Sequence, residues 1–236
     1  MKVSQKPQIS TVMSVYNGMP YLKDAVRSIL AQTYKNFEFI IVDDGSTDDS
    51  WKYLKGLKDK RIKLIKNEKN LGLASSLNKG LKIAKGAYIA RMDADDVSLP
   101  ERFKKQANFL NQHKDYVLIG SQVQWVDKNG RDISGFEVPQ KDQEIKRKFL
   151  FRNQIHHATV MFKKSAIGKP EAYRTFLNGI EDYDLWFRIF KKGKVANLPE
   201  RLVKRRIHKE ALSQKNHLKT EVLALFVRLI NILKLT

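Results

Sequence analysis

Cysteine is absent from this chain of 236 residues. Disulfide bonds and thiolate zinc sites are therefore excluded, and a reducing compartment fits the composition. The first residues, Met1 to Pro7, lack the apolar stretch of a signal peptide. No run of about 18 apolar residues occurs, so we do not expect a membrane-spanning helix. These absences favour a cytoplasmic protein, with peripheral contact to the inner face of the cell membrane left open.

Acidic residues are scarce, because 25 Asp and Glu stand against 45 Lys and Arg and give a formal net charge of +20. Such a surface attracts anions, which include nucleic acid, anionic lipid and phosphorylated substrates. The basic residues are scattered, without zinc-finger spacing or an aromatic RNA-binding signature. Nucleic acid is therefore the less favoured partner. A hydrophobic content of 42% predicts a globular core.

The few acids are nevertheless clustered. Asp43 and Asp44 directly follow the apolar stretch 39–42, and a second cluster at 93–96 follows the stretch 87–90. Crowded carboxylates repel one another unless a cation or a bound ligand compensates them. In an open parallel sheet, ligands bind at the carboxyl ends of the strands. The pattern predicts a divalent metal that holds a phosphorylated ligand.

Alternating strand and helix patterns predict a doubly wound, Rossmann-like first half. Strands are expected there at 9–15, 37–42, 61–66 and 87–92, and helices at 21–32, 50–57, 74–84 and from 100 onward. The second half is less regular, with strands expected at 117–126 and 158–163 and helices at 142–149 and 182–190. The fold class is therefore α/β.

Four short segments lie after a predicted strand or at the start of a predicted helix, at 14–17, 42–46, 93–96 and 179–186. In order and spacing they resemble glycosyltransferase family 2, the inverting nucleotide-sugar enzymes with a GT-A fold. The resemblance implies a doubly wound mixed sheet flanked by helices, with a C-terminal helical extension. We divide the chain into a GT-A domain at 1–205, with a nucleotide-binding half at 1–110 and an acceptor-binding half at 111–205, and a basic, amphipathic helical segment at 206–236.

The resemblance also assigns a donor site. Asp44 would accept a hydrogen bond from the nucleotide base, although it could instead stabilise the helix that follows it. Asp93 would face the ribose or the water shell of a metal. Arg91 would reach the diphosphate, and Asn78 would support the 70–72 loop over the donor. The remaining donor-binding positions are Ser14, Val15, Tyr16, Asn17 and Ala94.

A metal site is implied at Asp95, the last residue of the Asp-x-Asp motif, with Mn²⁺ or Mg²⁺ as the cofactor. The leaving group is a nucleoside diphosphate, and a hard cation on oxygen ligands neutralises the charge that builds as the bond to the sugar breaks. His208 matches a late histidine that can complete this site, although a single histidine is often structural. Asp96 is expected at a helix entry or behind the metal ligands.

The resemblance places the general base at Asp182, which would take a proton from the attacking acceptor hydroxyl. Glu181 beside it would raise the proton affinity of Asp182 or orient the acceptor. Both acids could also merely favour a helix N-terminus, and that is the role expected of Asp184. His157 and Trp186 are the residues assigned to the acceptor side.

The C-terminal segment 222–235 is apolar over most of its circumference but too short and too interrupted to span a bilayer. Basic residues precede it, at 204–206, Lys209, Lys215 and Lys219. This combination suits a helix lying in an anionic membrane surface. Docking on the domain itself or on a second subunit is the alternative, so a homo-oligomer stays open.

The favoured hypothesis is an inverting, metal-assisted transferase that moves a sugar from a nucleotide-diphosphate donor, with UDP favoured, to a saccharide or lipid-linked saccharide in bacterial surface polysaccharide synthesis. A Mg²⁺-dependent sugar nucleotidyltransferase is the first alternative, but it would begin with a Gly-rich basic loop after the first strand. Residues 16–20 do not form such a loop. A basic nucleic-acid-binding protein is the second alternative, and it leaves the acidic clusters unexplained.

Overall fold

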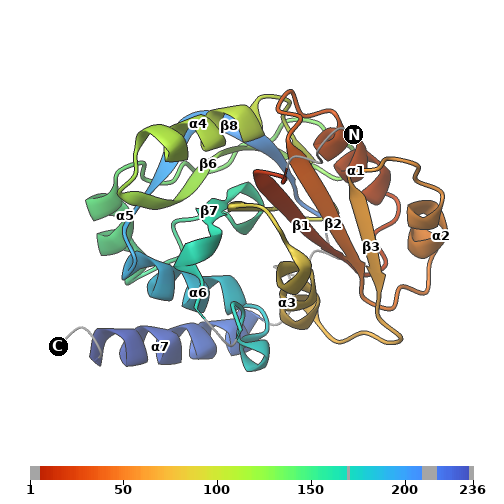
Figure 1. The fold of residues 1–236 in the computed structure, drawn as a ribbon. Helices are drawn as coiled ribbons and strands as arrows, with labels where there is room; N and C mark the ends of the chain where they lie inside the picture. Colours follow the sequence, from red (N-terminus) through yellow and green to blue (C-terminus); the bar gives the residue numbers. More distant parts are fainter. Residues whose placement is uncertain (1–5, 169–170, 209–216, 234–236) are drawn as a thin grey trace.

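The computed structural model describes residues 6–168, 171–208 and 217–233. Within them, one sheet carries eight strands in the order β3-β2-β1-β4-β7-β6-β8-β5 (Figure 1). The strands are β1 Ile9–Val15, β2 Phe37–Asp43, β3 Ile62–Lys66, β4 Tyr88–Arg91, β5 Val97–Ser98, β6 Tyr116–Val126, β7 Met161–Lys163 and β8 Lys194–Arg206. The helices are α1 Leu22–Leu30, α2 Ser50–Lys55, α3 Leu73–Ile83, α4 Arg102–Gln112, α5 Asp142–Phe149, α6 Glu181–Phe190 and α7 His217–Leu233.

The first four strands form the parallel part of the sheet. β1 lies between β2 and β4 and pairs with both in parallel, and β3 extends the sheet beyond β2. β2 is buried along its whole length, because helices cover both faces of a parallel sheet. Its one interior acid, Glu38, is paired with Ser10 and Lys63. The strands and helices predicted for this half are confirmed to within about two residues at their ends, as is usual for element boundaries.

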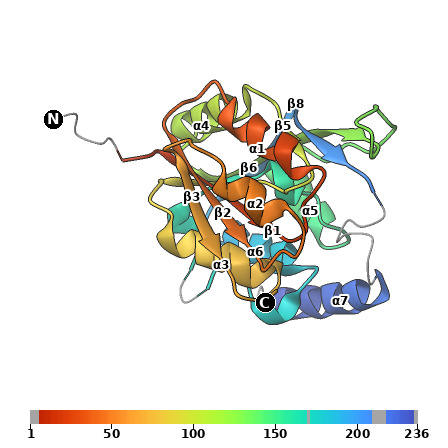
Figure 2. The same ribbon diagram turned by 90° about the vertical axis from the view of Figure 1, so that its right-hand side faces the viewer.

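The second half turns the sheet antiparallel and then parallel again. β7 pairs antiparallel with both β4 and β6, and the long β8 runs parallel to β6 with three register shifts. The mixed α/β architecture expected from the sequence is confirmed. Helices α1 and α4 lie over one face of the sheet and α3, α5, α6 and α7 over the other (Figures 1 and 2). The two larger hydrophobic clusters lie beneath these two sets of helices.

Two predictions for the second half need correction. The strand predicted at 158–163 begins only at Met161, because His157–Thr159 forms a short 3₁₀ helix. Both the backbone N–H and the hydroxyl of Thr159 donate to the carbonyl of His156, at 2.9 and 2.8 Å, and such local bonds compete with a strand ladder. No strand was predicted at β8, where Pro199 and Glu200 interrupt the alternation that marks a strand.

The C-terminal helix α7 packs one face on the domain. Ala224 and Val227 are buried in the core beneath α6, and the guanidinium of Arg228 donates to the hydroxyl of Tyr183 at 3.1 Å. The described residues contain no helix long and apolar enough to cross a membrane. Residues Lys209, Lys215, 234 and 235 of the predicted membrane-contact segment and its basic flank lie outside the described residues.

The basic residues 204–206 belong to β8 and not to a membrane-facing flank. Arg206 is buried, and its backbone and guanidinium bind the loop 93–96. β8 also runs through the predicted division between the domain at 1–205 and the segment at 206–236. The appended helix, as far as the structure describes it, begins at His217.

Candidate functional site

The site lies at the carboxyl ends of β1, β2 and β4. Val15 at the end of β1 is in register with Asp43 at the end of β2, and β4 leads directly into the acidic loop 93–96. Parallel pairing therefore brings three sequence segments, far apart along the chain, to one edge of the sheet. A crevice at this edge is where open α/β sheets bind ligands.

Three carboxylates meet in the loop after β4. One oxygen from each of Asp93, Asp95 and Asp96 lies within 4.8 Å of the others. Burial, and then repulsion by Asp93, raises the pKa of Asp95. Burial, and then repulsion by Asp95, raises the pKa of Asp96 well above its ordinary value. The cluster therefore favours a bound cation.

Arg206 at the end of β8 and His208 just after it hold this loop in place. His208 lies with its Nε2 at 2.9 Å from an oxygen of Asp95, which places the predicted metal residues Asp95 and His208 together. The backbone N–H of Arg206 donates to Asp96 at 2.8 Å. Asp96 is not at a helix entry, because β5 and not a helix follows it. It instead anchors the acidic loop to β8, behind Asp95.

Arg91 is the counter-ion of this cluster. Its side chain is 3% exposed and its guanidinium forms an ion pair with Asp93. The same positive charge partly offsets the rise that burial causes in the pKa of Glu181 and of Asp182. The sequence predicted Arg91 as a diphosphate ligand, whereas the structure buries it between the two acidic groups. The negative charge of the acids is therefore already compensated in part by Arg91, before any metal ion binds.

Glu181 and Asp182 form the second acidic pair, at the start of α6. Glu181 is 3% exposed and accepts a hydrogen bond from the backbone of Gly179 at 2.7 Å. Asp182 accepts one from the side-chain amide of Asn153 at 2.9 Å and another from the backbone N–H of Tyr183 at 2.7 Å. Burial and the charge of Asp182 raise the pKa of Glu181 to about 7. Burial also raises the pKa of Asp182, which suits a proton acceptor.

His157 and Trp186 lie beside this pair, but in different environments. The Nε2 of His157 is 2.9 Å from the hydroxyl of Tyr173, and burial and the charges of Arg91 and Arg205 lower the pKa of its imidazole. Trp186 is fully buried and packs edge-to-face on His157 and Phe162. The prediction that Trp186 contacts an acceptor is therefore wrong, because its ring supports His157 from the core.

Asp44 joins the end of β2 to the loop before α3. Its carboxylate accepts hydrogen bonds from the side chain of Asn67 at 2.7 Å and from the backbone of Leu71 and Gly72, each at 2.9 Å. Asp44 is buried. Its assigned contact with a nucleotide base stays a prediction, and the structure adds a second role in fixing the 67–72 loop.

Asn78 holds the 171–177 segment and not the 70–72 loop. The two ends of its amide bond the backbone N–H and carbonyl of Tyr173, at 3.0 and 2.7 Å. The predicted support of the donor loop by Asn78 is therefore corrected. The residue instead positions Tyr173, which in turn bonds His157.

The segment 14–17 splits into buried and exposed residues. Val15 is fully buried in the core, so its side chain cannot line a nucleotide base as predicted. Tyr16 is 49% exposed at the same edge. Asn17 has a φ of 49°, and its side-chain oxygen accepts from the backbone of Thr47 at 2.8 Å. Its amide thus shapes the loop after β2, while Tyr16 is free to contact a ligand.

The remaining assigned donor residues lie near this turn. Ser14 is half-buried in β1, and Ala94 is half-buried against the core under α1. An added Cβ at Gly18 would lie 3.7 Å from the Cβ of Ala94. The turn after β1 and the acidic loop therefore face each other closely.

The donor atoms fit a hard divalent cation. Mg²⁺ and Mn²⁺ prefer carboxylate oxygens, and the Asp93, Asp95 and Asp96 oxygens lie close enough to share one ion. His208 could add a nitrogen ligand through the atom that now contacts Asp95. The residues present therefore fit the metal that the sequence resemblance implies.

Several residues of this site were not predicted from sequence. Asn153 bonds Asp182 across 29 positions, Tyr173 bonds His157 across 16, and Arg206 bonds Asp96 across 110. No local pattern distinguishes these residues from ordinary surface or core side chains. Only the packing of the second half on the first reveals them.

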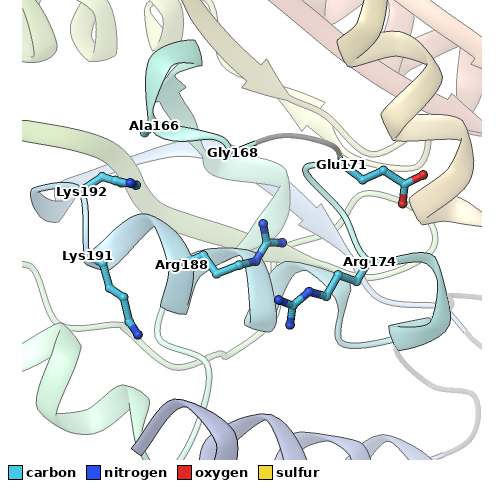
Figure 3. A pocket seen from close by; sticks show the side chains of 7 residues that line it. All are labelled: Ala166, Gly168, Glu171, Arg174, Arg188, Lys191 and Lys192. Atoms are coloured by element: carbon cyan, nitrogen blue, oxygen red, sulfur yellow. The ribbon is translucent and has the colours of Figure 1, made fainter. Parts of the chain in front are cut away.

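A separate basic hollow is lined by residues of α6 and of the segments next to it, and contains none of the predicted site residues. Its volume is about 430 Å³, and Figure 3 shows Arg174 and Arg188 facing each other across it. Both arginines pair with the buried Asp184, at 2.9 and 2.8 Å. The carboxylate of Asp184 therefore ties α6 to the preceding segment, which agrees with the non-catalytic role expected of it.

Known proteins similar to this chain are glycosyltransferases. The model of the family described as glycosyl transferase family 2 matches residues 10–169, more than half of the chain. The uncharacterized glycosyltransferase MJ1057 of Methanocaldococcus jannaschii is 41% identical over 86% of this chain and 71% of its own. The O-antigen biosynthesis glycosyltransferase WbnJ of Escherichia coli is 37% identical over 89% of this chain and 83% of its own.

Solved structures of TarS from S. aureus share the fold. Residues 1–349 of TarS in complex with UDP-GlcNAc superpose with a TM-score of 0.77 at 19% identity, over 96% of this chain and 66% of that one. The match to a longer TarS structure spans 37% of that chain. The GT-A architecture predicted from the sequence is thereby confirmed.

The nucleotidyltransferase and nucleic-acid-binding alternatives find no support in these comparisons. The family match covers the strand ends and the acidic loop described above, and the relatives extend the similarity through α6. On this combined evidence, the chain is a glycosyltransferase and belongs to glycosyltransferase family 2.

Proposed function

We propose that this glycosyltransferase is inverting and metal-assisted and that it uses a UDP-sugar as its donor. The acceptor is a hydroxyl of a saccharide or lipid-linked saccharide in surface polysaccharide assembly. The observation that carries the proposal is the convergence of two acidic groups on one buried cation. Asp93 pairs directly with Arg91, and the charge of Arg91 also reaches Glu181 and Asp182.

On the donor side, Asp93, Asp95 and His208 would hold a Mn²⁺ or Mg²⁺ ion. That ion, when bound, neutralises the two phosphates of the leaving nucleoside diphosphate. Asp96 keeps the loop in place through its bond to the backbone of Arg206. Exposed Tyr16 is well placed to pack against the nucleotide base.

On the acceptor side, Asp182 takes the proton from the acceptor hydroxyl as that oxygen attacks the anomeric carbon. The bond between the anomeric carbon and the diphosphate oxygen breaks on the opposite face, so the configuration inverts. Asn153 fixes the orientation of the Asp182 carboxylate. Glu181, with its pKa raised to about 7, limits the negative charge beside the base, because a protonated Glu181 does not repel Asp182.

The names of the similar proteins support the donor and the pathway. The TarS structure contains UDP-GlcNAc, and WbnJ is an O-antigen biosynthesis glycosyltransferase. Both are properties of those proteins, and they make UDP-sugars and polysaccharide acceptors the first candidates to test here.

Thermal melting with UDP-, GDP- and dTDP-sugars, with and without Mn²⁺, tests the donor side. A ligand that binds only the folded state raises the melting temperature. We expect a shift with a UDP-sugar plus Mn²⁺, lost in Asp95→Asn. Asp49→Asn is the matched control, because Asp49 is an exposed carboxylate outside the site. Shifts that are equal with and without Mn²⁺ would overturn the metal assignment.

We also propose that α7 contacts an anionic membrane surface. Its outward face carries four apolar residues at helical spacing, each more than half exposed, namely Val222, Leu225, Phe226 and Leu229. The formal charge of +20 favours an anionic surface over a neutral one.

Sedimentation with vesicles tests this contact. We expect binding to vesicles that contain anionic lipid and weaker binding after Phe226→Ser with Leu229→Ser. Ile133→Ser is a control at an exposed apolar residue outside α7. A stable dimer at low protein concentration that dissociates in the double variant would instead assign this face to a second subunit.

A further inference from the structure

An aromatic–arginine cluster, made of Trp125, Phe136, Arg152, His156 and Arg205, lies in the second half of the chain. Trp125 is near the end of β6 and Arg205 near the end of the neighbouring β8. Phe136 is in the loop after β6, which extends beside β8 in Figure 2. Arg152 and His156 come from the segment between α5 and the 3₁₀ helix. Four separate segments therefore build one surface.

The aromatic rings and the cations alternate in space. The guanidinium of Arg152 lies 4.3 Å from the centre of the Phe136 ring, and that of Arg205 lies 5.0 Å from the centre of the Trp125 ring. His156 contacts both rings, at 5.5 and 5.6 Å between centroids. Phe136 is 41% exposed, so the cluster opens to solvent at this ring and at Arg152.

The arginines of the cluster form no direct ion pair with an acid in the described part of the chain. No ion pair there includes Arg152 or Arg205. The bond of Arg205 goes to the Nδ1 of His156, at 3.2 Å. Burial and the two arginines lower the pKa of His156 to about 3, so it stays neutral. Its Nε2 is buried and has no hydrogen-bond partner.

The cluster is adjacent to the proposed base. Asn153, which follows Arg152, donates to the carboxylate of Asp182 at 2.9 Å. The charge of Arg205 also reaches Asp182, because it offsets part of the rise that burial causes in the pKa of that carboxyl. An acceptor that presents its hydroxyl to Asp182 would therefore place its neighbouring groups near Arg152, Arg205 and Phe136.

We propose that the aromatic–arginine cluster is an acceptor subsite for a saccharide with a negatively charged group next to the attacking sugar, either a phosphate or diphosphate or a carboxylate. Guanidinium groups bind such anions with paired, charge-assisted hydrogen bonds. Aromatic side chains with a few polar groups are the usual lining of small-molecule sites. The inference rests on the proposed function, because it takes Asp182 as the base.

Binding to the protein saturated with UDP and Mn²⁺ tests the inference, because the donor site is then filled. Isothermal titration would compare matched pairs of acceptors: glucuronides with glucosides, galacturonides with galactosides, and glycosyl diphosphates on a short lipid with the corresponding neutral lipid glycosides. We expect one class of anion to bind about ten- to a hundredfold more tightly than its neutral partner. The pair that shows the preference identifies carboxylate or diphosphate.

Arg152→Ala should remove this preference while leaving the affinity for UDP and Mn²⁺ unchanged. Arg205→Ala should weaken the preference as well, and Arg147→Ala, at an exposed position on α5, is the matched control. Equal binding of charged and neutral acceptors, no binding of either, or a preference that survives Arg152→Ala would overturn the inference. Failure of UDP and Mn²⁺ to bind at all would instead contradict the proposed function.

Discussion

The two acidic clusters of this protein, at 93–96 and at 181–182, place their carboxylates in different surroundings. Asp93, Asp95 and Asp96 lie in a loop at the end of β4, and Asp93 and Asp95 meet cationic or imidazole partners there. Glu181 and Asp182 begin a helix, and their bonded partners are backbone N–H groups and one amide. The first group gathers several oxygens around one point, as a metal ion requires. In the second group, the pKa of Glu181 is raised to about 7, and burial also raises the pKa of Asp182, the proposed proton acceptor.

The difference shows that the side chains around each acidic group, rather than the acids themselves, decide whether the group suits metal binding or proton transfer. Arg91 forms an ion pair with Asp93 of the first group, and its charge partly offsets the rise in the pKa of Glu181 and Asp182 in the second group. At Glu181 the effect of burial outweighs that of Arg91, so the pKa of Glu181 stays raised, at about 7. Tests of the site therefore compare the two groups directly.

The largest effect is expected at the base. Asp182→Asn removes the proton acceptor and keeps a similar shape, so sugar transfer should fall by about 10²- to 10⁴-fold. The melting shift with donor and Mn²⁺ should persist, in contrast to Asp95→Asn. Steady-state transfer rates and thermal melting measure the two quantities. Transfer within a few-fold of the parent protein would show that Asp182 is not the base.

A smaller effect, on stability rather than on activity, is expected at the ion pair between Arg91 and Asp93. Asp93→Asn leaves the buried guanidinium of Arg91 without its ion-pair partner, which should lower the free energy of unfolding by roughly 3–5 kcal/mol. Urea unfolding measures this loss. The double variant Arg91→Met with Asp93→Asn should recover part of the stability, because it also removes the charge left unpaired. Equal losses in the single and double variants would contradict the ion pair.

The smallest effect concerns the pH dependence of stability. Glu181 has its pKa raised from 4.5 to about 7 in the folded state, so folding favours its neutral form. Stability should therefore be greatest below about pH 4.5 for this group and decline as pH rises to about 7, by roughly 3 kcal/mol. Glu181→Gln should remove that part of the decline. Urea unfolding at pH 5 and pH 7.5 would show parallel losses in both proteins if the pKa of Glu181 were ordinary.

The sequence predicted the first half of the fold closely and the second half only in part. β2 was placed correctly, because its apolar run 39–42 leads directly into Asp43 and Asp44. β8 was missed because Pro199 interrupts it and because three register shifts accommodate it beside β6. A strand that depends on a neighbour for its register leaves little trace in its own residues.

For single residues of the candidate site, too, the sequence predicted some contacts and missed those that depend on packing. Asp95 and His208 were paired in advance by resemblance, and they lie 2.9 Å apart. Trp186 and Val15 were assigned to ligands but are fully buried, because their positions in the motif do not reveal which way the side chain points. Asn153 and Tyr173 had no signal in the sequence at all.

The sequence by itself determined that acids follow two buried parallel strands, since apolar runs and the residues that end them are local features. It also determined the family, through segments whose order along the chain is preserved. Only the tertiary structure decided that Arg91 is buried between the two acidic groups and that Arg152 and Arg205 meet aromatic rings beside Asp182. Apart from the Arg91–Asp93 pair, those contacts join residues at least 16 positions apart, and their energies depend on burial, which arises only when the second half packs on the first.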